Sequence, residues 1–233
     1  LSEMKKFVLP NDYPDMSSSL MHIYLIEAGP RLLAGMSEES SAHAEQFLRE
    51  MGVNILLNKR VVDYRDHKVV LEDGTEIATR TFIWVSGVTG VTIGNLDASL
   101  IGRGGRIKVD SFNRVEGMNN VFAIGDQCIQ LADENYPNGH PQLAQVAIQQ
   151  GELLAKNLIR MEKGQEMKPF HYRNLGSMAT VGRNRAVAEF SKVKMQGWFA
   201  WVMWLVVHLR SILGVRNKVI VLLNWVWNYF TYD

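Results

Sequence analysis

The sequence contains a single cysteine, Cys128, in 233 residues. One cysteine excludes an internal disulfide and a cysteine-rich metal site. It also argues against disulfide reductases and sulfide:quinone reductases, because those enzymes rely on a redox pair or on several cysteines. Without a second thiol, Cys128 is predicted to be a buried packing residue.

The sequence also lacks an excess of charge of either sign. Its 25 lysine and arginine residues balance 24 aspartate and glutamate residues, so nothing indicates a nucleic-acid partner. The six histidines are scattered without the spacing of metal ligands, which predicts that the chain holds no metal. No secretory signal pattern follows Leu1.

A further absence concerns the glycine fingerprint of dinucleotide-binding folds. No G-x-G-x-x-G occurs in the chain. Gly102-Arg-Gly-Gly105 and Gly87-Val-Thr-Gly90 have other spacings, and neither lies between a predicted strand and a predicted helix. The chain therefore carries no pyrophosphate-binding loop of the usual form.

The N-terminal part has the pattern of a βα unit followed by a small antiparallel meander. Residues 22–27 form an apolar run that ends at Glu27, and Ser37 followed by two glutamates predicts the start of a helix. Asp73-Gly74 favours a tight hairpin turn. The predicted strands of this part cover residues 53–57, 60–64, 69–71, 76–78 and 81–85.

The C-terminal part alternates short strand patterns with one long helix. Residues 106–109 and 121–124 are predicted strands. The turn-rich loop around Pro137 leads into a predicted helix over 142–161. Residues 170–193 are predicted to be β-structure.

Two motifs carry the chemistry. Val121-Phe-Ala-Ile-Gly-Asp126 is a buried strand pattern that ends in a glycine and a carboxylate, at the sheet edge where ligands of open α/β folds bind. Gly125 allows a close approach of the backbone to a ligand. The second motif, Ala144-Gln-Val-Ala-Ile-Gln-Gln-Gly151, opens the long helix with small residues. Gln145 and Gln149 are four residues apart and share one helix face.

Together these two motifs resemble the C-terminal half of the type II NADH:quinone oxidoreductases, the alternative NADH dehydrogenases that do not pump protons. The resemblance covers nearly the whole chain. It implies an α/β fold with two dinucleotide-binding domains of the FAD/NAD(P)-binding Rossmann type, incomplete here, with C-terminal membrane-interface helices. Both glycine fingerprints of the family would lie upstream of Leu1, so the chain is expected to be a fragment that is inactive alone.

The resemblance divides the chain into four parts. Residues 1–92 would complete the NADH-binding domain, and residues 93–165 would complete the FAD-binding domain. Residues 166–196 would form a β-rich connection, and residues 197–233 would form amphipathic helices that anchor the protein to a membrane. The family's proposed acidic catalytic residue also lies upstream, so the catalytic residues of this enzyme stay unknown.

The resemblance also assigns roles at the flavin and the quinone. Gly125 and Asp126 would bind FAD, with the Asp126 carboxylate on a ribityl hydroxyl. Ala144 and Gln145 would face the flavin ring, where the positive end of the helix stabilises negative charge. Gln145 and Gln149 would bind the quinone. A polar helix with alanines chosen for helix propensity is the alternative interpretation.

Two further positions are assigned to NADH. Glu27 lies at a strand end, where an acid binds the adenosine ribose and repels a 2′-phosphate, which favours NADH over NADPH. The alternative is an ordinary carboxylate at the end of a strand. Gly87 would lie near the nicotinamide, although a plain turn glycine fits the same position.

The tail supplies a reason for a membrane location. Residues 197–209 and 219–232 are two apolar runs rich in tryptophan and tyrosine, separated by Arg210, Arg216 and Lys218. Each run is shorter than the roughly 20 residues that span a bilayer, so two helices lying at the membrane interface are predicted. A hairpin buried in a soluble core is the alternative.

The expected partners are a membrane quinone and the lipid surface, and a homodimer is compatible with the resemblance. The expected location is the cytoplasmic side of the cell inner membrane, as a peripheral protein. Two other hypotheses remain open: a flavin reductase of the ferredoxin-reductase type with a soluble acceptor, and a truncated chain that persists only as a membrane-tethered piece of the fold.

Overall fold

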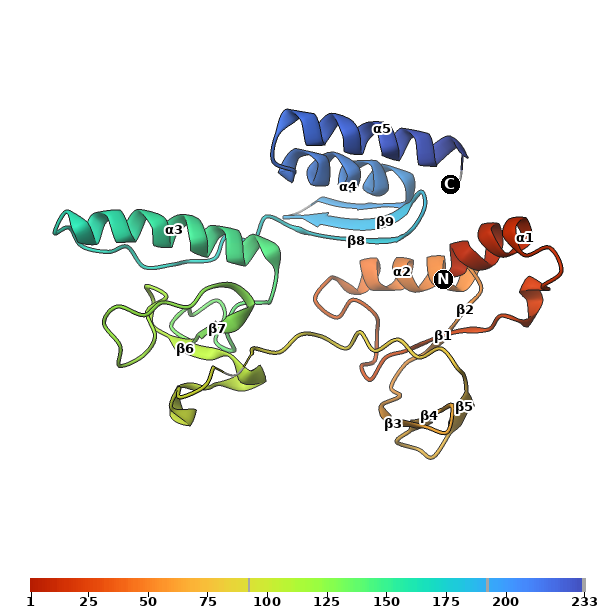
Figure 1. Ribbon diagram of the computed structural model, residues 1–233, viewed down its shortest axis with the longest axis horizontal. Helices are drawn as coiled ribbons and strands as arrows, with labels where there is room; N and C mark the ends of the chain where they lie inside the picture. The colour runs from red at the N-terminus through yellow and green to blue at the C-terminus, as the bar shows by residue number, and fades with distance from the viewer. Residues whose placement is uncertain (92, 192, 232–233) are drawn as a thin grey trace. The chain divides into compact units, whose positions relative to one another are not determined.

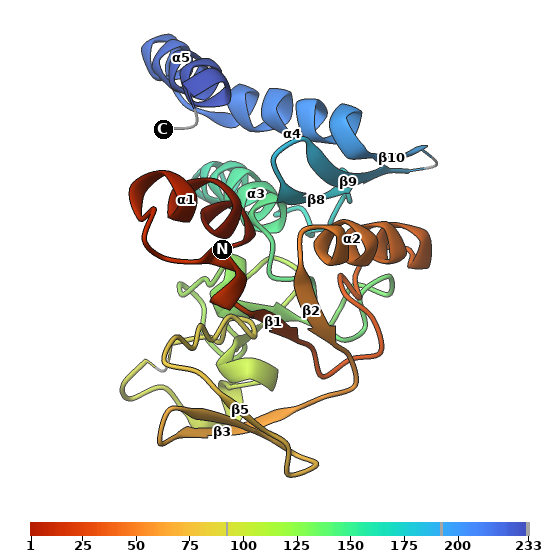
Figure 2. The ribbon, with the colours of Figure 1, turned by 90° about the vertical axis from the view of Figure 1, so that its right-hand side faces the viewer.

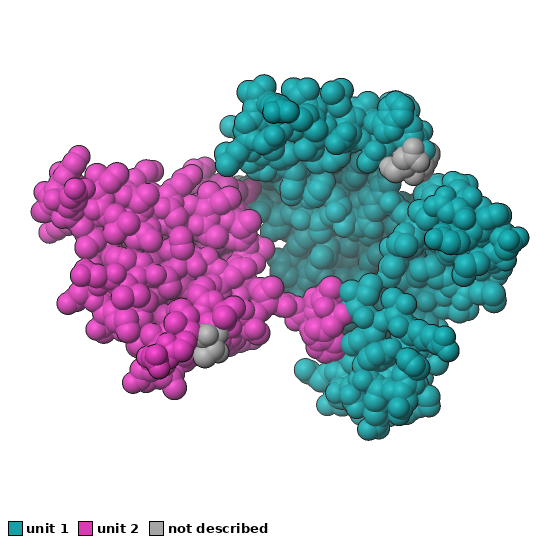
Figure 3. Space-filling model, in the orientation of Figure 1, with its two compact units in different colours: residues 1–83, 176–233 teal, residues 84–175 magenta. Residues whose placement is uncertain are grey.

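The computed structural model describes residues 1–91, 93–191 and 193–231, and it has the α/β fold that the sequence predicts (Figure 1). The chain divides into two compact units, one of residues 1–83 with 176–233 and one of residues 84–175 (Figure 3). The predicted domain boundaries at 92, 165 and 196 stay a prediction.

Unit 1 begins with short helical turns and a βα unit. The turns are η1 (Met4–Val8), α1 (Leu9–Asp12) and η2 (Ser18–Leu20). Strands β1 (Ile23–Ile26) and β2 (Val53–Leu56) pair in parallel, and α2 (Glu38–Glu50) connects them. The predicted strand at 22–27 and the helix after Ser37 are confirmed, since the Ser37 hydroxyl caps the helix by accepting from Ser40 N–H.

The predicted meander follows as β3 (Val61–Arg65), β4 (Lys68–Leu71) and β5 (Glu76–Ala78) in the order β3-β4-β5. The hairpin at Asp73-Gly74 is confirmed by a hydrogen bond of 2.9 Å from Gly74 N–H to Leu71 O. The strand predicted at 81–85 is wrong, because these residues have no regular structure and pair with no described strand. Trp84 and Val85 are exposed instead.

The rest of unit 1 is a three-stranded sheet covered on both faces. Its strands β8 (Ser177–Gly182), β9 (Arg185–Phe190) and β10 (Val193–Gln196) pair antiparallel in the order β10-β9-β8, which confirms the β-structure predicted at 170–193 from residue 177 onward. Ala186 and Ala188 pack against Ala200 of α4 (Gly197–Ser211). Val187 points the other way, to Met36 and α2, so the two helices lie on opposite faces of the sheet (Figure 2).

The tail forms the two predicted helices, α4 and α5 (Val215–Thr231). They contact each other through aromatic side chains, with ring centroids 5.7 Å apart for Trp201 and Tyr229 and 6.4 Å apart for Trp204 and Trp225. Arg183, in the turn between β8 and β9, donates to Asn228 O at 2.8 Å and so ties α5 to the sheet. Within the described residues, no helix has the length and apolar character needed to cross a bilayer.

Unit 2 contains the parallel pair β6 (Ile107–Val109) and β7 (Cys128–Gln130) and the long helix α3 (Ala144–Glu162). Three short 3-10 turns complete it: η3 (Ala98–Leu100), η4 (Arg103–Gly105) and η5 (Gly125–Gln127). The strand near 106–109 and the helix near 142–161 are therefore confirmed.

The strand predicted at 121–124 is wrong, because in the described residues this segment pairs only through a single bridge between Phe122 and Arg114. The sheet strand lies a few residues later, at Cys128–Gln130, where the side chains are buried. Ile107, Val109, Val115 and Cys128 form the core of the unit.

Candidate functional site

The turn at Gly125 lies directly against helix α3. Gly125 has a φ of +66°, which disfavours any residue with a side chain, and a Cβ added there would lie 3.2 Å from the Cβ of Ala147. The Gly125 N–H donates to Gln150 Oε1 at 2.7 Å. Gly125 and Ala147 thus let helix α3 pack against the Gly125-Asp126 turn, and the predicted close approach to a ligand stays a prediction.

Two groups at this junction are available to a ligand. The Asp126 carboxylate is exposed and accepts no hydrogen bond from the described residues, whereas its main-chain oxygen accepts from Gln142 Nε2 at 3.1 Å. Helix α3 begins without a side-chain cap, and Ala144 N–H has no acceptor among the described residues. A free carboxylate beside an uncapped helix N-terminus suits a ligand that carries hydroxyl groups and a negatively charged edge.

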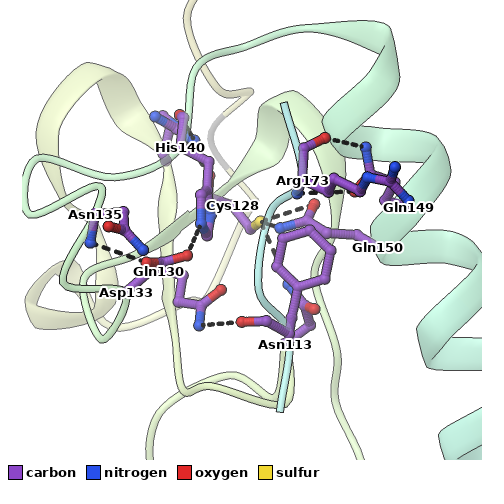
Figure 4. A network of polar contacts seen from close by, with 11 residues as sticks. Asn113, Cys128, Gln130, Asp133, Asn135, His140, Gln149, Gln150 and Arg173 are labelled. Carbon is purple, nitrogen blue, oxygen red and sulfur yellow. Dashed lines mark hydrogen bonds and ion pairs between the residues drawn. The ribbon is translucent and has the colours of Figure 1, made fainter. Parts of the chain in front are cut away.

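The two glutamines predicted to face the quinone bind a neighbouring segment of the same unit. Gln149 Oε1 accepts from Arg173 N–H at 3.0 Å, and Gln149 Nε2 donates to Arg173 O at 2.9 Å (Figure 4). Gln145 Oε1 accepts from Leu175 N–H at 3.1 Å. Their shared helix face therefore holds residues 173–175 along α3.

Gln150 is a functional position that the sequence alone did not single out. It is 1% exposed, and besides the Gly125 bond its Nε2 lies 3.5 Å from the sulfur of Cys128. Burial raises the pKa of the Cys128 thiol above its ordinary value, which agrees with the packing role predicted for it. The helical period could have indicated Gln150, because it lies one turn after Val146, a buried residue of the same face.

A buried polar pair lies in the loop before α3. His140 Nε2 and Asp133 Oδ2 are 3.0 Å apart, with both side chains almost fully buried. Burial alone raises the pKa of the Asp133 carboxyl, but the hydrogen bonds from His140 and from Asn135 N–H outweigh it, so the pKa lies below its ordinary value.

A third buried group is the guanidinium of Arg106. Its Nε donates to Cys128 O at 2.6 Å, and one terminal nitrogen donates to His140 O at 3.1 Å. Burial lowers the pKa of Arg106. Arg106 thus joins the start of β7 to the end of the loop that precedes α3.

The two positions assigned to NADH have simple surroundings. Glu27 follows β1 in unit 1, and its Oε1 accepts from Gly29 N–H at 2.7 Å, whereas its Oε2 accepts no hydrogen bond from the described residues. Gly87 has a φ of +108° in an exposed stretch without regular structure in unit 2, and a Cβ there would contact nothing within 4 Å. Gly87 is therefore a glycine required by its backbone conformation.

Unit 2 also has an apolar groove of about 450 Å³ beside the Gly125 turn. The groove is lined chiefly by Ile93, Leu96, Val115, Met118, Val121 and Phe122. In the described part of the chain, no three histidine, cysteine or acidic side chains converge as metal ligands do. In unit 1, Lys194 pairs with Glu39 at 2.9 Å.

Comparison with known proteins assigns two stretches of the chain to family models. Residues 14–151 match the family model described as pyridine nucleotide-disulphide oxidoreductase, and residues 174–231 match the NDH2 C-terminal domain. A type II NADH:quinone oxidoreductase of Mycobacterium tuberculosis is 34% identical over 96% of this chain and 49% of its own length. An internal alternative NAD(P)H-ubiquinone oxidoreductase of Arabidopsis thaliana is 32% identical over 90% of this chain and 44% of its own length.

Among solved structures, NDH2 from Plasmodium falciparum in complex with NADH superposes with a TM-score of 0.86 at 18% identity, covering 99% of this chain and 62% of that one. At that identity the likeness establishes the fold alone. The chain spans about half the length of the curated relatives it matches. It belongs to the pyridine nucleotide-disulphide oxidoreductase family and, within it, to the type II NADH:quinone oxidoreductases, of which it represents the C-terminal half.

Proposed function

We propose that this chain forms the C-terminal half of an enzyme that oxidises NADH with bound FAD and reduces a membrane quinone by two electrons, without pumping protons. The observation that carries the proposal is the junction of the free Asp126 carboxylate with the uncapped start of α3. The names of the relatives, which are NADH:quinone and NAD(P)H-ubiquinone oxidoreductases, support the reaction.

The residues at the junction fit a flavin nucleotide. Asp126 can accept from a ribityl hydroxyl, and the Gly125 turn that presents it is held in place because Gly125 N–H donates to Gln150 Oε1. Ala144 N–H, at the positive end of α3, can donate to the pyrimidine edge of the ring. Bound FAD supplies the hydride-accepting chemistry, and the protein tunes it through such contacts.

The quinone would bind along the face of α3 that carries Gln145 and Gln149. A side-chain amide nitrogen carries two hydrogens, and Gln149 Nε2 donates one of them to Arg173 O. Its second hydrogen can be donated to a quinone oxygen. In this proposal the two glutamines also position residues 173–175, which would form one wall of the quinone site.

Each unit offers one position for NADH, Glu27 in unit 1 and Gly87 in unit 2. The unused Oε2 of Glu27 can accept from the adenosine ribose, and its charge would repel a 2′-phosphate. Gly87 would let the backbone pass close to the nicotinamide. The name of the Mycobacterium tuberculosis relative, an NADH:quinone oxidoreductase, supports the choice of this nucleotide.

The tail would hold the enzyme on a lipid surface. Helices α4 and α5 and the turn between them expose large apolar side chains, among them Trp198, Phe199, Leu213, Trp227 and Phe230, and exposed apolar patches mark interaction surfaces. Arg210, Arg216 and Lys218 can contact anionic headgroups. We place the enzyme on the cytoplasmic side of the inner membrane as a peripheral protein, with a homodimer as its proposed assembly.

The test is to purify the native enzyme and its Asp126→Ala variant and to measure flavin content and NADH oxidation with a short-chain quinone. A hydrogen bond to a charged group contributes about 1.5–3 kcal/mol, so the variant is expected to bind flavin roughly tenfold to a hundredfold more weakly. Glu116→Ala removes another exposed carboxylate of unit 2 and should change nothing. A native enzyme without flavin, or one that reduces only soluble acceptors, contradicts the proposal.

A further inference from the structure

The loop of residues 131–143, between β7 and α3, is closed by a buried pair of side chains. Asp133 Oδ2 and His140 Nε2 are 3.0 Å apart, and the other carboxylate oxygen, Oδ1, accepts from Asn135 N–H at 3.0 Å (Figure 4). Both side chains are at most 3% exposed. An unpaired carboxylate at such a position would be costly, so the pair constrains the whole loop.

An aromatic box around the imidazole fixes its orientation. The ring of His140 lies 5.2 Å from that of Phe170 and 5.9 Å from that of Tyr172, both edge-on, and 5.1 Å from that of Tyr136. His140 Nδ1 has no hydrogen-bond partner among the described residues. The single proton of the neutral ring is therefore best placed on Nε2, where it is donated to Asp133.

The same residue is held through its main chain. Arg106 donates to His140 O at 3.1 Å, and the preceding Gly139 passes so close to β7 that a Cβ there would lie 2.6 Å from a carbon of Ile129. His140 is thus fixed at both side chain and backbone, four residues before the first residue of α3.

The start of α3 is held by contacts further along the helix, because Val146 packs against Phe170 and Tyr172 and Gln150 accepts from Gly125 N–H. Its N-cap residue is Leu143, which provides no side-chain cap. Just before the helix, Gln142 Nε2 donates to Asp126 O. The loop ahead of α3 therefore contributes to the position of Ala144 N–H.

We propose that Asp133 and His140 are a positioning pair, whose hydrogen bond holds the first turn of α3 at the flavin. Both side chains are buried within unit 2, and they would act through the helix end, which would stabilise negative charge on the reduced ring. This inference rests on the proposed function, since it requires flavin at the Gly125-Asp126 junction.

The test compares the flavin midpoint potential of the purified holoenzyme in wild type, His140→Leu, His140→Gln and Asp133→Ala, followed by the absorbance of the bound flavin. If the helix end stabilises the reduced flavin about tenfold less in His140→Leu, the two-electron potential falls by about 30 mV. Asp133→Ala is expected to show the same fall. His140→Gln keeps an amide N–H for Asp133 and is expected to restore most of the potential.

Two controls separate positioning from loss of stability. Glu134→Ala changes an exposed side chain of the same loop, and Ile55→Val weakens the separate core around β1 and β2; neither is expected to move the potential. An unchanged or raised potential in folded His140→Leu and Asp133→Ala overturns the positioning role, as does a His140→Gln variant no better than His140→Leu. A wild-type enzyme that carries no flavin instead overturns the proposed function.

If His140→Leu does not yield folded enzyme, the flavin midpoint potential is compared in His140→Gln and Asp133→Asn instead. Both preserve a polar side chain at the buried pair, and both retain at least part of the hydrogen bond. The inference then requires His140→Gln to keep nearly the wild-type potential and Asp133→Asn to lower it. Equal potentials in the wild type and Asp133→Asn would overturn it.

Discussion

Replacing Gln150 by methionine should destabilise unit 2 by loosening the contact between α3 and the Gly125 turn. Methionine has a similar length and is apolar, so it fills the same buried space but cannot accept the Gly125 N–H. It also cannot reproduce the 3.5 Å contact of the amide nitrogen with the Cys128 sulfur. The rest of the helix keeps its own contacts.

The expected loss follows from those two contacts. A typical hydrogen bond contributes about 0.5–1.5 kcal/mol net, and a buried donor left without an acceptor costs about 1–3 kcal/mol. Gly125 is only half-buried, so water can recover part of the lost bond, and the lower part of the combined range applies. We therefore expect a loss of about 1–3 kcal/mol in the free energy of unfolding.

Urea unfolding followed by circular dichroism measures this loss. With a slope of about 2 kcal/mol per molar urea, the midpoint should fall by roughly 0.5–1.5 M. Glu152→Gln, at an exposed position of the same helix, should leave the midpoint unchanged. A Gln150→Met midpoint equal to that of the wild type would refute the view that Gln150 fixes the turn.

Three further predictions concern backbone strain, pH and the membrane. Gly125→Ala should lower the free energy of unfolding by about 1–2 kcal/mol because of the left-handed φ. The crowding of the new Cβ against Ala147 of α3 should lower it further. Gly117→Ala has the same sign of φ but open space around it, so thermal unfolding should show the larger loss at Gly125, and equal losses would argue against that contact. The pKa of Asp133 is lowered in the folded state, so its stabilising contribution is present above the unfolded value of about 4 and is lost as pH falls below it. The stability difference between wild type and Asp133→Asn should therefore shrink in acid-pH urea titrations, and a constant difference from pH 7 to pH 3 would count against the pair. Trp227→Asp should weaken co-sedimentation of the protein with anionic vesicles at least tenfold, whereas Val62→Asp, on the meander, should not. Equal binding of both variants would contradict the proposal that the tail binds the membrane.

Local sequence patterns were sufficient to predict those elements that are stabilised by contacts between residues close together in the chain. Ser37 followed by acids predicted the start of α2, and its hydroxyl does cap the helix. Asp73-Gly74 predicted the turn between β4 and β5. In each case the interaction joins residues only a few positions apart, so the sequence itself contains both partners.

Strands were harder to predict from the sequence, because a strand forms only where a second strand pairs with it. Residues 81–85 and 121–124 both have strong strand patterns. In the described chain, however, no strand pairs with residues 81–85, and residues 121–124 form a single β-bridge. Cys128–Gln130 has a weaker pattern but lies beside β6 and pairs with it in parallel. Pairing, which depends on distant residues, decided which pattern became a strand.

Some features of the candidate site could likewise be predicted from the sequence, and others depend on the fold. The sequence by itself determined the family, the glycine and carboxylate at Gly125 and Asp126, and the small, glutamine-bearing start of α3, because these are short contiguous motifs. Only the tertiary structure decided that Gln150 faces Gly125, and that His140 is buried with Asp133 among aromatic rings that include Phe170. The reason is physical: hydrogen bonding and burial of a polar side chain depend on what the folded chain brings beside it, and those neighbours lie up to tens of residues away.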